Sequence, residues 1–398
     1  MVLLIYFLLL LCVALPLGEV SRVTPGLAIS FTLVDIVVAI GFGCWMIRQI
    51  VFNKRPVSFQ AKTFIVLTGI FVLSLLTNWT TLSLPQVATA SLYILRWVVF
   101  GGLFFMVKNS SASSKHKLTI VLFVSGTLLL LGGYVQYLLY PSLRNLLYFG
   151  WDEHFYRMFG TFFDPNFFGL FLVLFLLLVL SKLFTMSVQK EKVLFAGLFV
   201  LGSIIFTAIF LTYSRTALIA LFAGLMILFW NKKFWKWLWV VSIAVCVTAG
   251  IFFFAPKKTQ DMNSLFRMTS TNARIGSARN ALAIFWQRPI LGVGFNAYRY
   301  AQYRNHFMLG SPIQEDHGAS GADSSLLLVF ATSGIIGFCA FLLFLWSHVR
   351  ILKKSKKRIG LATFVALFVG SFFVNGLFYP FLLIWLWVVL GITERDEQ

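Results

Sequence analysis

The sequence predicts an all-α polytopic membrane protein of about twelve transmembrane helices with one long helical extracytoplasmic loop. Hydrophobic residues make up 59% of the 398 residues and charged residues only 12%, and the mean hydropathy is +0.88. A chain of this composition has too little polar surface to cover a water-soluble globule. The apolar residues also fall into stretches near ~20 residues, the length at which a helix crosses a bilayer.

Charged residues, prolines and asparagines divide the apolar sequence into the expected membrane helices. Met1 to Leu17 has neither the basic segment nor the cleavage site of a signal peptide, so we expect it to remain as the first helix. The eighth span is short, and the last two could form one broken hairpin. In order, the expected spans are Val2 to Leu17, Leu27 to Ile47, Thr63 to Trp79, Val87 to Val107, Leu118 to Tyr140, Pro165 to Leu183, Val193 to Tyr213, Thr216 to Trp230, Trp237 to Phe254, Ser324 to Val349, Ile359 to Val374 and Leu377 to Ile392.

Alternate connections between these spans are rich in lysine and arginine, and the positive-inside rule assigns them to the cytoplasm. Both termini are then cytoplasmic, and the number of helices is even. The short connections of the other side at 18–26, 77–86 and 375–380 carry only Glu19 and Arg22. The cytoplasmic basic residues are Arg48, Lys54, Arg55, Lys62, Lys108, Lys115, Lys117, Lys182, Lys190, Lys192, Lys232, Lys233, Lys236, Arg350, Lys353, Lys354, Lys356, Lys357 and Arg358.

Two outer connections are longer than the rest, 141–164 and 255–322, and the second holds eight basic and three acidic residues. The positive-inside rule does not apply to long loops, so the basic residues of this loop are available to bind a ligand. We therefore divide the chain into helices one to nine (1–254), a basic extracytoplasmic loop with amphipathic helices (255–322), and helices ten to twelve with a cytoplasmic C-terminus (323–398). The distribution of the basic residues between the two sides of the membrane accounts for the net charge of +20 and therefore excludes a nucleic-acid partner.

The long loop predicts two helical segments around a turn. From Asn272 to Gln287 the apolar residues recur at helical spacing, which predicts an amphipathic helix on the membrane surface or over the bundle. It ends before Pro289, and Gly292-Val293-Gly294 turns the chain into a second segment, Tyr298 to His306. Without a preceding strand or a third glycine, this GxG is a turn and not a dinucleotide-binding loop.

The arginines of this loop are candidates for binding an anion, because a guanidinium stays charged and matches phosphate oxygens with a fork of donors. Anionic lipid headgroups are their plainer partner. Arg215 starts a helix at an outer turn, where free N–H groups and the helix dipole also favour an anion. The alternative for Arg215 is a contact with headgroups at the membrane edge.

Charges within or beside the spans form another set of candidates. Asp35 and Arg96 lie about eight and nine residues into their helices, at a shared depth, so we expect a structural ion pair rather than a proton relay. Asp164 and Pro165 suit the N-cap and first position of the sixth helix. If that cap faces an outer cavity, Asp164 could also act as an acid or base. The four cysteines lie singly in apolar runs, so we expect packing roles and no metal site.

Four motifs occur in order on the predicted outer face: GTFFDPN (160–166), YSRTALIAL (213–221), RIGSARNALAIFWQRPILGVGF (274–295) and ADSSLLLVFATSGIIGF (322–338). Over this region the chain resembles the O-antigen ligase and polymerase family, also called the Wzy-C family. The resemblance implies a GT-C-like, metal-independent glycosyltransferase of surface polysaccharide assembly, without a cofactor, in the bacterial inner (plasma) membrane. It moves a glycan from an undecaprenyl-pyrophosphate carrier to a sugar hydroxyl on the outer face.

The implied partners are a lipid-linked glycan donor, a glycan acceptor, the lipid bilayer and a chain-length regulator protein. By the same resemblance, four arginines match positions that hold the pyrophosphate of the carrier. Several guanidinium groups could stabilise the charge of that leaving group. They are Arg215, Arg274, Arg279 and Arg288.

The acceptor hydroxyl also needs a base within hydrogen-bond reach. Family ligases carry a His-Asn or similar pair just before the S-x-L-L run, where this chain has Ala322-Asp323. Either Asp323 takes this role, or Glu315, Asp316 or His317 reaches in from upstream, or the chain is not a ligase. The structural alternatives are a helix N-cap for Asp323 and an exposed loop position for His317.

We therefore favour a polymerase, which joins lipid-linked repeat units to one another, over a ligase, which transfers the polymer to lipid A core. A flippase or other transporter is the alternative from a different class, and a membrane scaffold is a third. A transporter predicts charges at the middle of the membrane or repeated halves. Apart from Asp35, Arg96 and Lys182, the last of which lies at the cytoplasmic end of the sixth span, the expected spans carry no charge.

Overall fold

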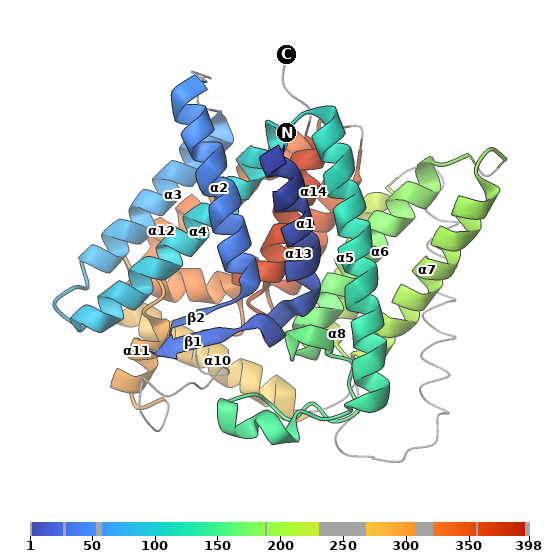
Figure 1. Ribbon diagram of the computed structural model, residues 1–398. Coiled ribbons are helices and arrows are strands. Elements are labelled where there is room, and N and C mark those ends of the chain that lie inside the picture. Colours follow the sequence, from blue (N-terminus) through green and yellow to red (C-terminus); the bar gives the residue numbers. More distant parts are fainter. Residues whose placement is uncertain are drawn as a thin grey trace.

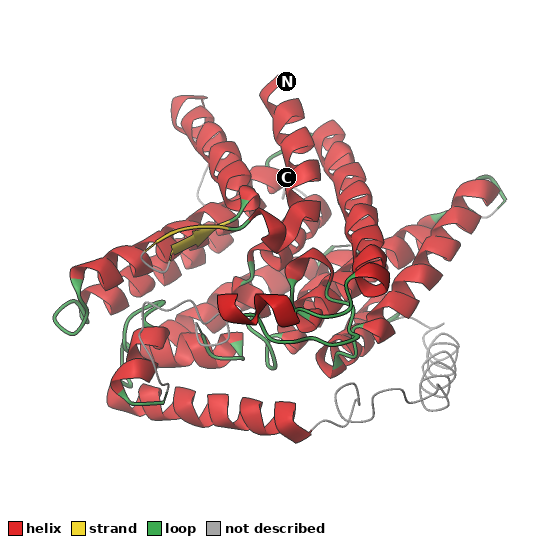
Figure 2. Cartoon of the chain, turned by 60° about the horizontal axis from the view of Figure 1, so that its bottom comes forward, coloured by secondary structure: helices red, strands yellow, loops and turns green. Residues whose placement is uncertain are grey.

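The computed structural model describes residues 2–26, 29–52, 58–187, 189–230, 268–307, 321–355 and 357–394. Helices dominate these ranges, and one short hairpin holds the only strands in them (Figure 1, Figure 2). The elements in chain order are α1 (Val2–Leu17), η1 (Gly18–Ser21), β1 (Val23–Gly26), β2 (Ile29–Phe31), α2 (Leu33–Phe52), α3 (Phe59–Leu76), α4 (Leu84–Lys108), α5 (Ala112–Leu139), η2 (Arg144–Phe149), η3 (Gly160–Phe162), α6 (Pro165–Thr185), α7 (Lys192–Leu211), α8 (Arg215–Leu228), α10 (Met268–Gln287), α11 (Tyr298–Arg304), α12 (Ser325–Leu352), α13 (Ile359–Gly370), η5 (Gly376–Phe378) and α14 (Pro380–Thr393).

Each expected span that falls within the described residues contains an α-helix. Among those residues, seven helices are long and apolar enough to cross a membrane, and four further apolar helices are shorter. The ninth expected span, Trp237 to Phe254, lies outside the described residues, and so does the expected boundary at 254. The helices therefore make this an all-α polytopic membrane protein, as the hydropathy predicts.

The prediction for the start of the second helix was wrong, because α2 begins at Leu33 and not at Leu27. Val23–Gly26 and Ile29–Phe31 form antiparallel strands instead, with Val23 opposite Phe31. The β-branched residues of this segment favour an extended backbone. The hairpin therefore lies at an end of the bundle, outside the helical region.

The helices run between two ends of the bundle. α1 starts and α14 finishes at the same end, which we call the terminal end (Figure 1). There, Glu394 accepts hydrogen bonds from Gln60 of α3 at 3.0 Å and from Lys108 of α4 at 2.5 Å. The hairpin, α10 and α11 lie at the opposite end, which we call the cavity end (Figure 1).

The centre of the bundle is α14. Its residues from Phe381 to Leu390 are buried, and Trp385 and Trp387 are among the largest fully buried side chains. It packs against α4, α5, α6 and α13. A helix that is apolar and buried on every side belongs to the interior.

The short helices α8, α13 and α14 leave a recess at the cavity end. They hold 14, 12 and 14 residues, so each is only ~20 Å long against a hydrocarbon core of ~30 Å. The connection 371–379 between α13 and α14 therefore lies inside the bundle. Irregular backbone at such a depth is tolerated where it is buried or lines a cavity. Here Ser325 of α12 donates its N–H to Ser371 O at 3.0 Å and accepts from Leu377 N at 3.1 Å.

α12 is broken at Gly334, whose φ of 63° and ψ of −167° interrupt the helix. Residues 289–294, between α10 and α11, lie against the break and supply the missing hydrogen bonds. Backbone groups freed by a break in an apolar environment must be satisfied by neighbouring protein. The N–H groups of Val293, Gly294, Ile335 and Ile336 donate to the carbonyls of Ala331, Thr332, Pro289 and Ile290, respectively, at 2.9–3.3 Å.

α10 lies across the cavity end rather than along the bundle (Figure 1). It packs on α12 through buried Ala281 and Ile284 and through Phe285, which stacks on Phe330 with ring centroids 3.8 Å apart. Of the apolar residues in its sequence, Leu282 and Trp286 remain 43% and 73% exposed. The helix therefore covers the end of the bundle with one face and leaves an apolar strip on the other.

Gly334→Ala should lower the free energy of unfolding by about 3 kcal/mol, because a left-handed backbone is strained for alanine. The added Cβ would also lie 2.3 Å from Ile290 O. Gly69→Ala is the matched control, since a Cβ at Gly69 meets nothing within 4 Å, and it should be neutral or stabilising by up to about 1 kcal/mol. Thermal unfolding of both variants in detergent measures the difference, and equal stability would contradict the role of the break.

Candidate functional site

A cavity of about 670 Å³ opens at the cavity end. Its wall combines the hairpin, the middle of α4, the segment 150–167, the start of α10, the segment 295–300, the start of α12 and the connection before α14. Charged side chains are concentrated in this wall, so their pairing decides which of them a ligand could reach. They are Glu19, Asp35, Asp152, Glu153, Asp164 and Asp323 among the acids, and Arg22, Arg96, Arg157, Arg274 and Arg299 among the bases.

Asp164 reaches the wall from the N-cap of α6. Its Oδ1 accepts hydrogen bonds from Asn166 N at 2.6 Å and Phe167 N at 3.2 Å, and Pro165 occupies the first position of the helix. Asn166 in turn accepts a hydrogen bond from Ser214, the N-cap of α8, at 3.1 Å. The starts of α6 and α8 therefore lie together, one bearing Asp164 and the other Arg215.

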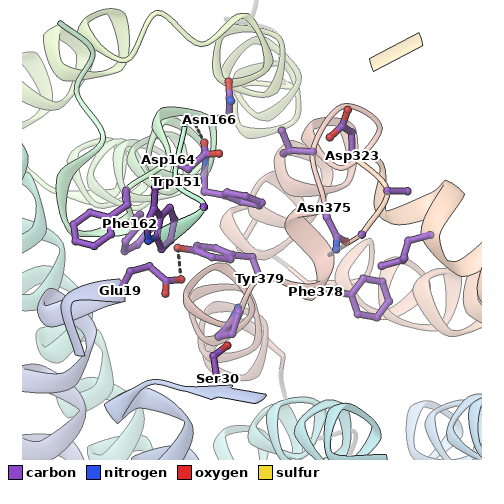
Figure 3. A pocket seen from close by; sticks show the side chains of 18 of the residues that line it. Glu19, Ser30, Trp151, Phe162, Asp164, Asn166, Asp323, Asn375, Phe378 and Tyr379 are labelled. Carbon is purple, nitrogen blue, oxygen red and sulfur yellow. Dashed lines mark hydrogen bonds between the residues drawn. The ribbon is translucent and has the colours of Figure 1, made fainter. Parts of the chain in front are cut away.

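Arg274 lines the cavity together with the two aspartates that the sequence singled out. Its charge interacts with Asp323 and, less strongly, with Asp164, and its guanidinium lies 6.0 Å from the centre of the Phe373 ring. Asp323 is placed by its own N–H, which donates to Ser277 of α10 at 3.1 Å. α10 thus brings a cation to the carboxylates of two other elements (Figure 3 shows Asp164 and Asp323 facing the same space).

Burial shifts the protonation of these groups. It raises the pKa of Asp164, against which the Asn166 and Phe167 N–H groups and the charges of Arg157 and Arg274 act. The surrounding protein also raises the pKa of Asp323, although solvent still reaches that side chain, and Arg274 opposes the shift. Burial lowers the pKa of Arg274, but an arginine remains a cation at neutral pH. The two carboxylates therefore accept protons more readily than exposed ones.

Arg215 lies beside this group without lining the cavity. It is the first residue of α8, and its guanidinium is close enough for its charge to act on that of Arg274. Two adjacent cations at a helix N-terminus form an environment that favours an anion.

The other predicted arginines lie elsewhere. Arg279 is exposed on α10 and is not part of the cavity wall. Arg288 lies past the other end of α10, where it donates to Thr77 O at 3.3 Å, and it too is outside the wall. Their pyrophosphate-binding roles remain predictions that the geometry favours less than those of Arg274 and Arg215. Glu315, Asp316 and His317 lie outside the described residues.

Asp35 and Arg96 form a two-pronged ion pair in the wall, with Arg96 Nε 2.8 Å from Asp35 Oδ1 and Nη2 2.9 Å from Oδ2. Asp35 lies in the first turn of α2, not eight residues deep, because α2 starts later than predicted. Its carboxylate also accepts from Thr32 N at 2.8 Å. The pair therefore joins α2 to α4 at the edge of the cavity.

Sequence reasoning missed the pairing of Glu19 with Tyr379. Tyr379 donates to Glu19 Oε1 at 3.0 Å, and Arg22 Nε lies 2.6 Å from Glu19 Oε2. Figure 3 shows Tyr379 between Asp164 on one side and Glu19 on the other. The signal available was weak: Glu19 and Arg22 are the only charges in an otherwise neutral connection.

A second missed group lies in the segment 150–157. His154 lines the cavity and could accept a proton, and Arg157 donates from Nε to Thr212 O at 2.9 Å, which joins this segment to the turn before α8. Among the described residues, no three His, Cys, Asp or Glu side chains gather as a metal site would require.

Asp164→Asn should fold as well as the original chain, because asparagine caps helices equally well, whereas Asp164→Ala should cost about 1 kcal/mol. The raised pKa means that the folded state holds the proton more tightly, so the ionised carboxylate lowers stability as the pH rises above the ordinary value of 3.8. Any gain in the free energy of unfolding of Asp164→Asn over the original chain at pH 7 should therefore shrink towards pH 3.8. Unfolding of the three proteins between pH 4 and 8 tests this, and an advantage that grew on acidification would contradict it.

One comparison with known proteins returns a match. The model of the O-antigen ligase family matches residues 198–342, which include three of the four ordered motifs and leave GTFFDPN outside. No curated protein sequence matches the chain. With its apolar helices, the match supports a multi-pass membrane protein of surface polysaccharide assembly. Over residues 198–342 the chain is thus similar to the O-antigen ligase family, which confirms the resemblance that its motifs indicate.

Proposed function

We propose that this chain is a glycosyltransferase that polymerises undecaprenyl-pyrophosphate-linked oligosaccharide repeat units at the outer face of the bacterial inner membrane. The observation that carries the proposal is that Arg274, Asp164 and Asp323 line one cavity of 670 Å³ and that the charge of Arg274 interacts with both aspartates. Such an arrangement offers a cation for a leaving group and a carboxylate for an acceptor hydroxyl in one space.

The proposed orientation places the terminal end in the cytoplasm. Basic residues gather in the connections at that end, which the positive-inside rule assigns to the cytoplasmic side. The cavity end then faces outwards, where a lipid carrier would present its pyrophosphate and glycan. Both chain termini are cytoplasmic in this arrangement.

Arg274 and Arg215 hold the pyrophosphate of the donor in this proposal. They are adjacent, and Arg215 lies at the N-terminus of α8, whose free N–H groups also favour an anion. Two guanidinium groups can neutralise the charge that develops on the pyrophosphate as it leaves. The mechanism therefore needs no metal ion or cofactor for this step.

Asp323 is the proposed base. It removes the proton of the acceptor hydroxyl while that oxygen attacks the anomeric carbon of the donor glycan. A new glycosidic C–O bond forms, the C–O bond to the pyrophosphate breaks, and the electron pair leaves with the lipid pyrophosphate. A carboxylate with a raised pKa suits this role, because it is a stronger base than a carboxylate of ordinary pKa.

A ligase that transfers the polymer to lipid A core is the second candidate, and the description of the matching family favours it. The two reactions share the donor and differ in the acceptor. Support for the polymerase comes from Ala322-Asp323, which stands where the family's ligases carry a His-Asn or similar pair. A chain-length regulator remains a proposed partner.

Arg274→Ala should reduce polymer synthesis about 10²–10³-fold, because a group that stabilises the leaving charge is lost. Arg279→Ala is the matched control on the same helix, since Arg279 is exposed and outside the wall, and it should change synthesis less than about threefold. The length distribution of the surface polysaccharide in cells that express equal amounts of each variant gives the answer. Unaltered polymer in Arg274→Ala cells would rule the proposal out. Loss of attachment with lipid-linked polymer still accumulating would favour the ligase.

Asp323→Asn should lower the rate of transfer about 10²–10⁴-fold. In the original chain the rate should fall as the pH drops through the raised pKa of Asp323, above 3.8, because the base must be ionised. The variant should lack this decline. Initial rates from pH 4 to 8 in proteoliposomes measure both effects, with Asp152→Asn, another carboxylate of the wall, as control. A rate in Asp323→Asn within about threefold of the original would move the base to His154 or to His317.

A further inference from the structure

The five arginines of the cavity wall differ in what they bind. Arg22 and Arg96 are paired with Glu19 and Asp35, Arg157 donates to backbone carbonyls, and Arg274 faces Asp323 and Asp164. Arg299 lines the same cavity, yet within the described residues it has no carboxylate or hydrogen-bond partner. A half-buried guanidinium without a partner leaves a fork of donors for a ligand.

Arg299 stands on a segment that is firmly held. Phe295, before α11, stacks on Phe71 of α3 with ring centroids 4.0 Å apart. Tyr300 forms a hydrogen bond with Thr89 of α4, and Arg304 donates to Thr81 O at 2.7 Å. Because these contacts lie on both sides of Arg299, its backbone is placed before any ligand binds. Binding groups held in advance lose less entropy when the ligand arrives.

A second polar side chain lies beside it without a partner. Asn296 has a left-handed backbone, with φ of 58°, which puts it in the cavity wall. Its amide has no hydrogen-bond partner among the residues that the structure describes. Arg299 and Asn296 therefore offer a positive charge and an amide donor from one short segment.

This pair lies on a different part of the wall from Arg274. Arg274 lies near the start of α10, whereas Arg299 lies on α11, which follows the other end of α10. The charge of Arg274 interacts with Asp323, Arg215 and Asp164, and that of Arg299 with Tyr300. Within the described chain, no interaction joins Arg274 and Arg299.

We propose that Arg299 and Asn296 form a second anion subsite, which holds the pyrophosphate of the lipid-linked acceptor while Arg274 and Arg215 hold that of the donor. The inference rests on the proposed polymerase function. In that reaction both substrates carry a lipid pyrophosphate, and the acceptor keeps its own while a distant hydroxyl at its glycan end reacts. Both lipids stand in the same leaflet, so the two pyrophosphates need separate sites at one end of the bundle. Arg299 binds and orients the acceptor and takes no part in bond making.

The test counts pyrophosphate sites directly. Farnesyl pyrophosphate serves as the probe, titrated by calorimetry into the full-length protein in detergent, with farnesol as the uncharged control. The original chain should bind two molecules and no farnesol. Arg299→Ala and Arg274→Ala should each bind one, because each removes one charge-assisted contact. Arg299→Lys should keep two sites with weaker binding at one, since a lysine retains the charge without the fork.

Kinetics in proteoliposomes give a second, independent measurement. Arg299→Ala should raise the KM for a lipid-pyrophosphate-linked acceptor about tenfold or more, the effect of one lost charge-assisted hydrogen bond. The KM for the donor, and the KM for the same oligosaccharide on a neutral alkyl group, should stay unchanged. Arg304→Ala is the matched control on α11, because Arg304 is bound to Thr81 and does not line the cavity.

One bound farnesyl pyrophosphate in the original chain, or two in Arg299→Ala, would overturn the proposal. The proposal would also be overturned if Arg299→Ala kept two pyrophosphate sites but lost binding to glucuronate, because Arg299 would then recognise an acidic sugar. If Arg299→Ala does not fold, Asn296→Asp tests the same subsite by placing a negative charge beside the guanidinium. Counting bound farnesyl pyrophosphate does not depend on catalysis. A protein that binds two molecules but synthesises no polymer would therefore refute the polymerase function and leave the proposed subsite standing.

Discussion

The hydrogen bonding of the broken helix α12 is the constraint on which the cavity depends. A break at Gly334 frees backbone groups inside an apolar bundle, where they cannot remain unpaired. Residues 289–294 satisfy them, and the same segment connects α10 to α11. α3 joins the junction, because Asn78 donates to Gly292 O at 3.0 Å and Ser74 to Thr332 O at 2.7 Å. One set of backbone contacts thus positions the helix of Arg274, the segment of Arg299 and the helix that follows Asp323.

The cavity balances opposite charges rather than concentrating one sign. Burying a lone guanidinium or carboxylate costs several kcal/mol, and a partner offsets much of that cost. Most arginines of the wall have such partners, which also fix their side chains in place. The short helices α13 and α14 end inside the bundle, so the charged groups lie below the cavity end of the longer helices. This position is close to where the headgroup of a lipid-linked substrate would lie. Charged groups below the membrane surface are tolerated because they face this polar space.

Most of the membrane helices could be predicted from the sequence, since apolar length and charged punctuation are local properties that tertiary contacts seldom override. The expected span Pro165 to Leu183 corresponds to α6, and Ile359 to Val374 to α13. The start of α2 was missed because the short segment before it pairs as a hairpin, and strand pairing has a weak signal over so few residues. That miss also placed Asp35 too deep.

The sequence by itself determined which side chains are candidates for the functional site. They are arginines in a loop that is predicted to face outwards, an aspartate at a helix N-cap and another aspartate before α12. Only the tertiary structure decided which of them meet. Arg274 and Arg279 are five residues apart, about 140° around a helix, so only one of them can face the cavity. Tyr379 reaches Glu19 across 360 positions of the chain, a contact that no local pattern encodes. Helices arise from neighbours in sequence, whereas a cavity arises from how helices of different length pack and end.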